Sequence, residues 1–106
     1  MMPSYQAEVT HHKILITQFK FVPAQLSVKS GDTVTWINQD MLPHNITAIS
    51  YKGQDKQQVL TKISLDLMKG DKFTTAVTKD FEYLCGFHPS MQGAVTLITI
   101  TKVIRK

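Results

Sequence analysis

Short stretches in which apolar and polar residues alternate recur along the chain. Alternation with a period of two is typical of strands that bury one face, because successive side chains point to opposite sides of a sheet. β-Branched and aromatic residues, which strands favour, are frequent in the same stretches. The pattern predicts strands at residues 13–17, 25–28, 33–37, 73–77, 81–85 and 95–103.

Turn signals separate these stretches at short intervals. Gly-Asp pairs occur at residues 30–32 and 69–71, and Lys79-Asp80 precedes another predicted strand. Such spacing is typical of an antiparallel sandwich or barrel. Residues 56–68 contain fewer β-branched residues and are the one stretch that leaves room for a helical turn. Because the sequence contains no internal repeat and no linker, we predict one all-β domain over residues 1–106. We expect this domain to be a Greek-key sandwich of about eight strands.

The phase of the alternation predicts which side chains form the core. Trp36 alternates in phase with Val34, so both face inward, and core packing is a better explanation for this Trp than a functional role. The predicted core contains Ile14, Ile16, Leu26, Val28, Val34, Trp36, Val77, Tyr83, Val95 and Leu97.

Charge and hydropathy exclude several classes of function. The 106 residues carry a net charge of +4, but the lysines are scattered and do not form the basic stripe that a nucleic-acid surface needs. No apolar run approaches the ~18 residues that span a bilayer. Residues 1–5 lack the apolar region of a secretory signal, which fits either an intracellular protein or a mature domain with a new start codon.

The candidate chemistry lies around the one cysteine. Cys85, His88 and Met91 follow each other at three-residue spacing, in a segment that we expect to form a tight loop after the 81–85 strand. Thiolate and thioether are soft donors that favour Cu(I), and imidazole binds both oxidation states of copper. With 4 His and 5 Met in the chain, this spacing has a chance of about 0.002 if motif matches are random.

A fourth donor is available at His44. It follows the strand that contains Trp36, so it can lie at the same end of the sandwich as the Cys85 segment. Two His, one Cys and a weak axial Met form the blue-copper electron-transfer site. His11 and His12 are adjacent and would point to opposite faces of a strand, so we interpret them as surface residues rather than a chelating pair.

Three motifs together resemble the small cupredoxins, the type 1 blue copper proteins that include plastocyanin, pseudoazurin and amicyanin. The motifs are Gly-Asp-Thr-Val-Thr-Trp-Ile-Asn at 31–38, Pro-His-Asn at 43–45 and Tyr-x-Cys-x-x-His-Pro-x-Met-x-Gly at 83–93. The two-residue gap between His88 and Met91 is similar to the amicyanin loop. The resemblance covers the chain from about Phe21 onward, but residues 51–67 carry no pattern that we can place.

The resemblance implies a role for each matching residue. His44, Cys85 and His88 would surround one copper ion that cycles between Cu(I) and Cu(II), with Met91 as the long axial ligand. Asn45 would tie the two ligand-bearing loops together from the second shell. The apolar residues that flank these ligands suggest, independently of the resemblance, a docking patch near His88. They are Met41, Leu42, Pro43, Phe87 and Pro89.

The resulting hypothesis is a soluble one-electron carrier and not an enzyme. We expect a monomer that docks transiently near His88 with redox partners such as a c-type cytochrome, a dehydrogenase or a copper oxidase or reductase. The family resemblance implies a periplasmic or otherwise exported location. The main alternative is a copper storage or delivery protein, although such proteins use paired Cys or Met-rich runs. Multicopper and dinuclear copper enzymes need more ligands than the 4 His and 1 Cys present. A catalytic zinc site needs an open coordination position and a general base, and the ligand loops contain no Asp or Glu beyond Asp40. A metal-free binding module would leave the ligand spacing unexplained.

Overall fold

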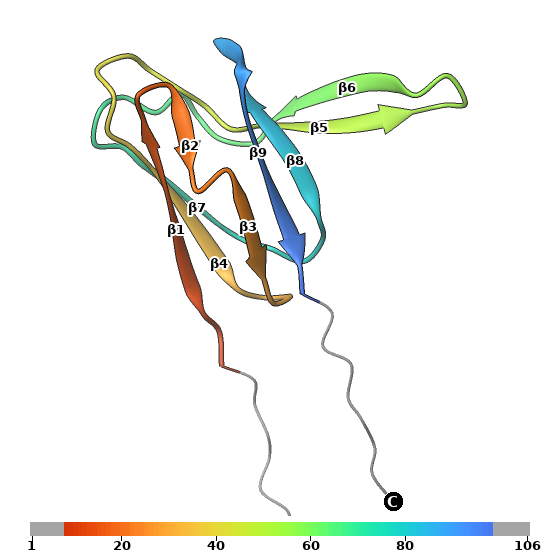
Figure 1. The fold of residues 1–106 in the computed structure, drawn as a ribbon, viewed down its shortest axis with the longest axis horizontal. Helices are drawn as coiled ribbons and strands as arrows, with labels where there is room; N and C mark the ends of the chain where they lie inside the picture. The colour runs from red at the N-terminus through yellow and green to blue at the C-terminus, as the bar shows by residue number, and fades with distance from the viewer. Residues whose placement is uncertain (1–7, 99–106) are drawn as a thin grey trace, which may run out of the picture.

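Two β-sheets pack face to face in the computed structural model, which describes residues 8–98 (Figure 1). The first sheet has four strands, in the order β2 (Lys20–Val22), β1 (His11–Thr17), β4 (Thr33–Asn38) and β7 (Lys72–Ala76). The second has five, in the order β3 (Gln25–Val28), β9 (His88–Leu97), β8 (Phe81–Cys85), β5 (Thr47–Lys52) and β6 (Gln57–Lys62). The described residues form no helix, and hence none that is long and apolar enough to cross a membrane.

The topology is mixed within each sheet. β1 pairs with β4 in parallel and β3 pairs with β9 in parallel, whereas the remaining pairs are antiparallel. Sequential strands repeatedly cross from one sheet to the other, as in β2 to β3 and β4 to β5. The predicted all-β sandwich is therefore confirmed, with nine strands in the described residues instead of about eight.

The predicted core is also confirmed. Trp36 and Val34 are fully buried on the inner face of β4, and the Trp36 ring stacks on Phe73 with ring centroids 5.8 Å apart. Tyr83 meets Trp36 edge-on from the opposite sheet at 5.5 Å. Of the predicted core residues, Leu26 and Leu97 are partly buried and pack against the edge of the cluster.

The β5–β6 hairpin corrects the helical turn expected within residues 56–68. Residues 57–62 form β6, which pairs with β5 along its full length. Figure 1 shows the hairpin extending beyond the sandwich. Every residue of β6 except Val59 is exposed, so its side chains show no inside-outside contrast and the sequence carries no strand periodicity there.

Three connections meet at one end of the sandwich. They are the β1–β2 turn, the segment between β4 and β5, and the β8–β9 turn (Figure 1). The predicted loop at 85–91 is shorter than expected, because β9 begins at His88 and includes Met91. The predicted strand 95–103 corresponds to the end of β9, and residues 99–103 lie outside the described range.

Candidate metal centre

Cys85 lies at the end of β8 and is fully buried. It follows Tyr83 by two residues, so both side chains point to the inner face, and the buried Tyr83 ring anchors the strand below the thiol. The β8–β9 pairing shifts register between Leu84 and Cys85, and Cys85 then pairs with His88. Only Gly86 and Phe87 form the turn, so the strand pair itself determines the distance between Cys85 and His88.

His88 and Met91 both belong to the first four residues of β9. The Nδ1 atom of His88 lies 3.9 Å from the Cys85 Sγ, and its side chain is partly exposed. Met91 is buried and belongs to the same apolar cluster as Cys85. His88 and Met91 are three positions apart near the start of β9, so one strand supplies both an imidazole and a thioether.

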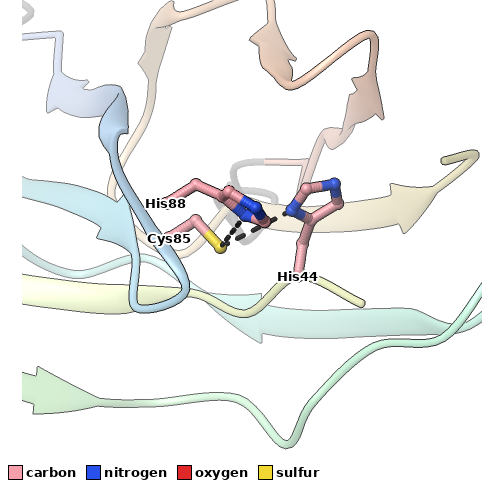
Figure 2. Close-up of side chains that lie close together, drawn as sticks. All are labelled: His44, Cys85 and His88. Atoms are coloured by element: carbon pink, nitrogen blue, oxygen red, sulfur yellow. Dashed lines mark hydrogen bonds between the residues drawn. The ribbon is translucent and has the colours of Figure 1, made fainter. Parts of the chain in front are cut away.

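His44 reaches the thiol from the opposite side. Its backbone is held by two hydrogen bonds with Leu67, one in each direction, at 3.1 and 2.7 Å. Its fully buried ring places Nδ1 3.6 Å from the Cys85 Sγ. Figure 2 shows the two rings converging on the sulfur, and one ligand atom from each of His44, Cys85 and His88 lies within 4.8 Å of the others. The structure thus brings together residues 41 positions apart in the sequence.

The donor set fits a copper ion. A thiolate and two imidazole nitrogens converge on one point, with a buried thioether on the adjoining strand. This combination is diagnostic for copper, since closed structural zinc sites are usually completed by a fourth Cys or His. The predicted residues His44, Cys85 and His88 are grouped, and Met91 lies in the same part of the core.

The second nitrogen of His44 contacts a residue that the sequence analysis did not identify as part of the site. The Nε2 atom donates a hydrogen bond of 2.8 Å to the Asp40 carboxylate, which is 13% exposed. Burial opposes ionisation of Asp40, but the hydrogen bonds from Phe19 N, His44 Nε2 and Gln18 N outweigh it, and the pKa of this carboxyl lies below its ordinary value. The four-residue separation of Asp40 and His44 was the available signal, but it does not reveal side-chain direction in a loop.

Asn45 connects the two ligand-bearing segments. Its Oδ1 atom accepts the backbone N–H of Gly86 at 2.8 Å and the Thr47 hydroxyl at 2.8 Å. Its Nδ2 atom donates to Asp66 at 3.3 Å. The residue is buried, and its hydrogen bond to Gly86 joins the segment of His44 to the segment of Cys85.

Phe19 is a second residue that the sequence analysis missed. Its ring meets His44 edge-on at a centroid distance of 5.5 Å and His88 at 5.0 Å. The ring is 46% exposed, so it covers the two imidazoles from the solvent side. Phe19 lies in the β1–β2 turn, far from the ligands in sequence, and no local pattern around it indicates this contact.

The remaining histidines lie away from the cluster. His11 is exposed and contacts Thr33, whereas His12 is partly buried and bonds Asp32 at 2.9 Å. The two side chains therefore lie in different surroundings. Among the described residues, the one group of three or more candidate ligands is the cluster around Cys85.

Comparison with known proteins identifies the family. Residues 8–98 match the model of the copper binding proteins of the plastocyanin/azurin family. The chain belongs to this family. It is 36% identical to amicyanin from Paracoccus denitrificans over 104 residues, which cover 90% of this chain and 72% of the relative. It is also similar to the structure of a purple cupredoxin from Nitrosopumilus maritimus, with a TM-score of 0.66, 30% identity, and coverage of 82% and 99% of the two chains.

One structural neighbour shares the fold at low identity. A copper-containing nitrite reductase from Thermus scotoductus superposes with a TM-score of 0.71 and 20% identity. The match covers 95% of this cupredoxin chain but 25% of the reductase chain. The likeness shows that the same sandwich occurs as a part of larger proteins.

The family and the donor set of this chain both indicate copper as the cofactor.

Proposed function

We propose that the chain is a one-electron carrier with a mononuclear type 1 copper site formed by His44, Cys85, His88 and Met91. The observation that supports it best is the convergence of a buried thiol and two imidazoles within 4.8 Å at one end of a cupredoxin sandwich. Bound copper would supply the one-electron couple between Cu(II) and Cu(I). The carrier would accept one electron from a reduced partner and donate one electron to an oxidised partner, with no bond made or broken in the protein.

Strand pairing and hydrogen bonds hold the proposed ligands in place. Cys85 is fixed by the β8–β9 pairing, and His44 is fixed by its backbone bridge to Leu67. Asn45 restrains the turn that separates Cys85 from His88. A pre-arranged site moves little when the charge on the ion changes, and this small rearrangement favours fast electron exchange.

Burial of the ligands favours the carrier over the alternative of copper storage or delivery. Cys85 and His44 have no exposed surface, and Met91 is 4% exposed. A delivery site must pass its ion to another protein through direct ligand exchange, which needs accessible donors. A catalytic metal site needs an open coordination position and a general base, whereas the four proposed ligands would fill the coordination sphere, so we propose that the chain is not an enzyme.

The surface around His88 is proposed as the docking surface. Met41 is 77% exposed, and Leu42 and Phe87 are each about half exposed. Together with Pro43 and Pro89, they form an apolar rim next to the partly exposed imidazole. A small apolar contact area favours weak and rapidly reversible binding. The proposed partners are a c-type cytochrome, a dehydrogenase or a copper oxidase or reductase, met by a monomer in the periplasm or another exported location.

An optical titration tests the copper site. Purified protein receives one equivalent of Cu(II), with Cys85→Ser as the ligand variant and Ser90→Ala as an exposed control on β9. We expect an intense visible thiolate-to-copper band in the wild type and the control, which a mild reductant bleaches reversibly, and no such band in Cys85→Ser. Absence of the band from the folded wild-type protein would contradict the proposal.

A second experiment tests the docking surface. Met41→Lys and Phe87→Lys are compared with Leu60→Lys, which introduces the same charge on the exposed β6 strand of the projecting hairpin. Electron transfer from a reduced c-type cytochrome is followed by stopped flow. We expect slower bimolecular transfer for the first two variants and an unchanged rate for the third. Equal rates in all three would reject this surface.

A further inference from the structure

The Asp40 carboxylate is held in a fixed position beside the His44 ring by several hydrogen bonds. Its Oδ2 atom accepts the His44 Nε2–H at 2.8 Å and the Phe19 backbone N–H at 3.0 Å, and its Oδ1 atom accepts the Gln18 N–H at 2.7 Å. Its own backbone N–H donates to the Asn38 side chain at 2.9 Å. Both carboxylate oxygens are thus occupied by donors, and the group is 13% exposed.

The turn that donates to Asp40 has an unfavourable backbone. Gln18 and Phe19 have φ values of 53° and 58°, in the left-handed region that residues other than Gly rarely adopt. Two-residue hairpin turns of this form usually contain Asn-Gly. Here the two N–H groups instead bond one carboxylate, which compensates for the cost of the conformation and immobilises the carboxylate.

The contact at Nε2 determines what the other nitrogen of His44 can do. A neutral imidazole carries one proton, and a carboxylate accepts hydrogen bonds but does not donate them when ionised. The proton therefore resides on Nε2, and Nδ1 presents a lone pair to the space in front of the Cys85 sulfur, 3.6 Å away. Metal-binding histidines are commonly oriented by such a carboxylate.

We propose that Asp40 is a positioning residue of the copper site, which holds the His44 ring in the ligating tautomer and stabilises Cu(II) relative to Cu(I). This proposal rests on the proposed function, because it assigns Asp40 a role toward the same ion. The negative charge acts through the His44 ring and favours the more positive oxidation state. Asp40 touches no substrate or partner in this role.

The first test needs no metal. Histidine ¹⁵N NMR spectra of the copper-free wild-type protein are recorded at pH 8, and His44 is assigned with the His44→Gln variant. We expect the proton of His44 on Nε2 alone. Any proton on Nδ1 would overturn the proposal, whatever copper does later.

The second test compares the two oxidation states. Cu(II) and Cu(I) affinities of Asp40→Asn are measured with competing chelators, and folding is checked by the near-UV circular dichroism of the copper-free protein. Asn offers one acceptor oxygen to three donors and carries no charge. We expect Cu(II) affinity to fall by about 10–100-fold, as is typical for such partners. If Cu(I) affinity falls tenfold less, the reduction potential rises by ~59 mV.

Two control variants separate this role from simpler causes. Asp55→Asn removes one negative charge from the exposed β5–β6 turn and should leave both affinities unchanged. Phe19→Ala removes the ring from the two imidazoles but keeps the backbone N–H that bonds Asp40. In copper-free Phe19→Ala the His44 proton should therefore stay on Nε2. A proton on Nδ1 in that variant, a potential shift in Asp55→Asn as large as that of Asp40→Asn, or unchanged copper affinities in folded Asp40→Asn would overturn the proposal.

The outcomes also separate this inference from the proposed function. A wild-type protein without the thiolate-to-copper band would reject the carrier, and it would leave the NMR result as a test of the His44 tautomer alone. A wild-type protein with the band, together with Asp40→Asn of the same potential and affinities, would keep the carrier and reject Asp40 as a positioning residue.

Discussion

The Asn45 side chain accepts the backbone N–H of Gly86 at 2.8 Å, and this bond joins two segments that lie 41 residues apart. Each segment supplies a proposed ligand next to the bond, His44 on one side and Cys85 on the other. The same oxygen accepts the Thr47 hydroxyl at 2.8 Å, so Asn45 is itself held in place. The distance between the ligand-bearing segments therefore depends on one buried amide.

Asn45→Ala should destabilise the copper-free protein by about 1–3 kcal/mol. The substitution leaves the Gly86 N–H and the Thr47 hydroxyl without their acceptor in a largely buried region. Urea unfolding followed by Trp fluorescence measures the loss, and Gln54→Ala in the exposed β5–β6 turn is the control. A copper-free variant as stable as the control would show that the bond contributes nothing before the metal binds.

Gly93→Ala should be costly for a steric reason. A Cβ atom on Gly93 would lie 2.4 Å from the Tyr83 hydroxyl oxygen and 2.5 Å from the ring carbon that carries it. Tyr83 is fully buried and cannot move aside without disturbing the core, so we expect a loss of about 1–3 kcal/mol or more in urea. Adding Tyr83→Phe should recover only part of the loss, since the ring carbon remains. Full recovery would place the clash on the hydroxyl alone.

Asp32 should make the protein sensitive to acid. The His12 side chain, the Thr10 N–H and the Lys29 N–H bond its carboxylate and hold its pKa well below the ordinary value of 3.8. A carboxyl with a depressed pKa in the folded state contributes stability above its unfolded pKa, and this contribution decreases as pH falls below about 4. Urea midpoints from pH 7 to pH 2 should fall less steeply for Asp32→Asn than for wild type. Parallel curves for the two proteins would contradict this.

The Tyr83 hydroxyl should ionise only at high pH. Burial raises its pKa to about 12, because the interior disfavours the phenolate. In an absorbance titration at 295 nm, one of the three tyrosines should ionise only near pH 12, and that step should disappear in Tyr83→Phe. A raised pKa implies stability that is present below the unfolded value of about 10 and is lost as pH rises from there. Ionisation of all tyrosines in the folded protein by pH 11 would refute the assignment.

The features predicted from the sequence are those encoded by local spacing. Strands such as β4 bury one face, so Val34 and Trp36 alternate with half-exposed residues and reveal both the strand and the core. Cys85, His88 and Met91 lie within seven consecutive residues, so the donor types and their spacing indicated copper. His44 lies far from this motif in the sequence, and its place in the site depends on the end of β4 lying next to the end of β8.

Tertiary structure alone decided the features that depend on contacts between distant segments. β6 escaped prediction because all of its residues except Val59 are exposed, which removes the alternation that marks a strand. Asp40 and Phe19 belong to the site because the β1–β2 turn folds over the segment after β4. The turn brings two backbone N–H groups to the carboxylate that also bonds His44. A one-dimensional pattern records which residues repeat, but the direction of a loop side chain is determined by what packs against it.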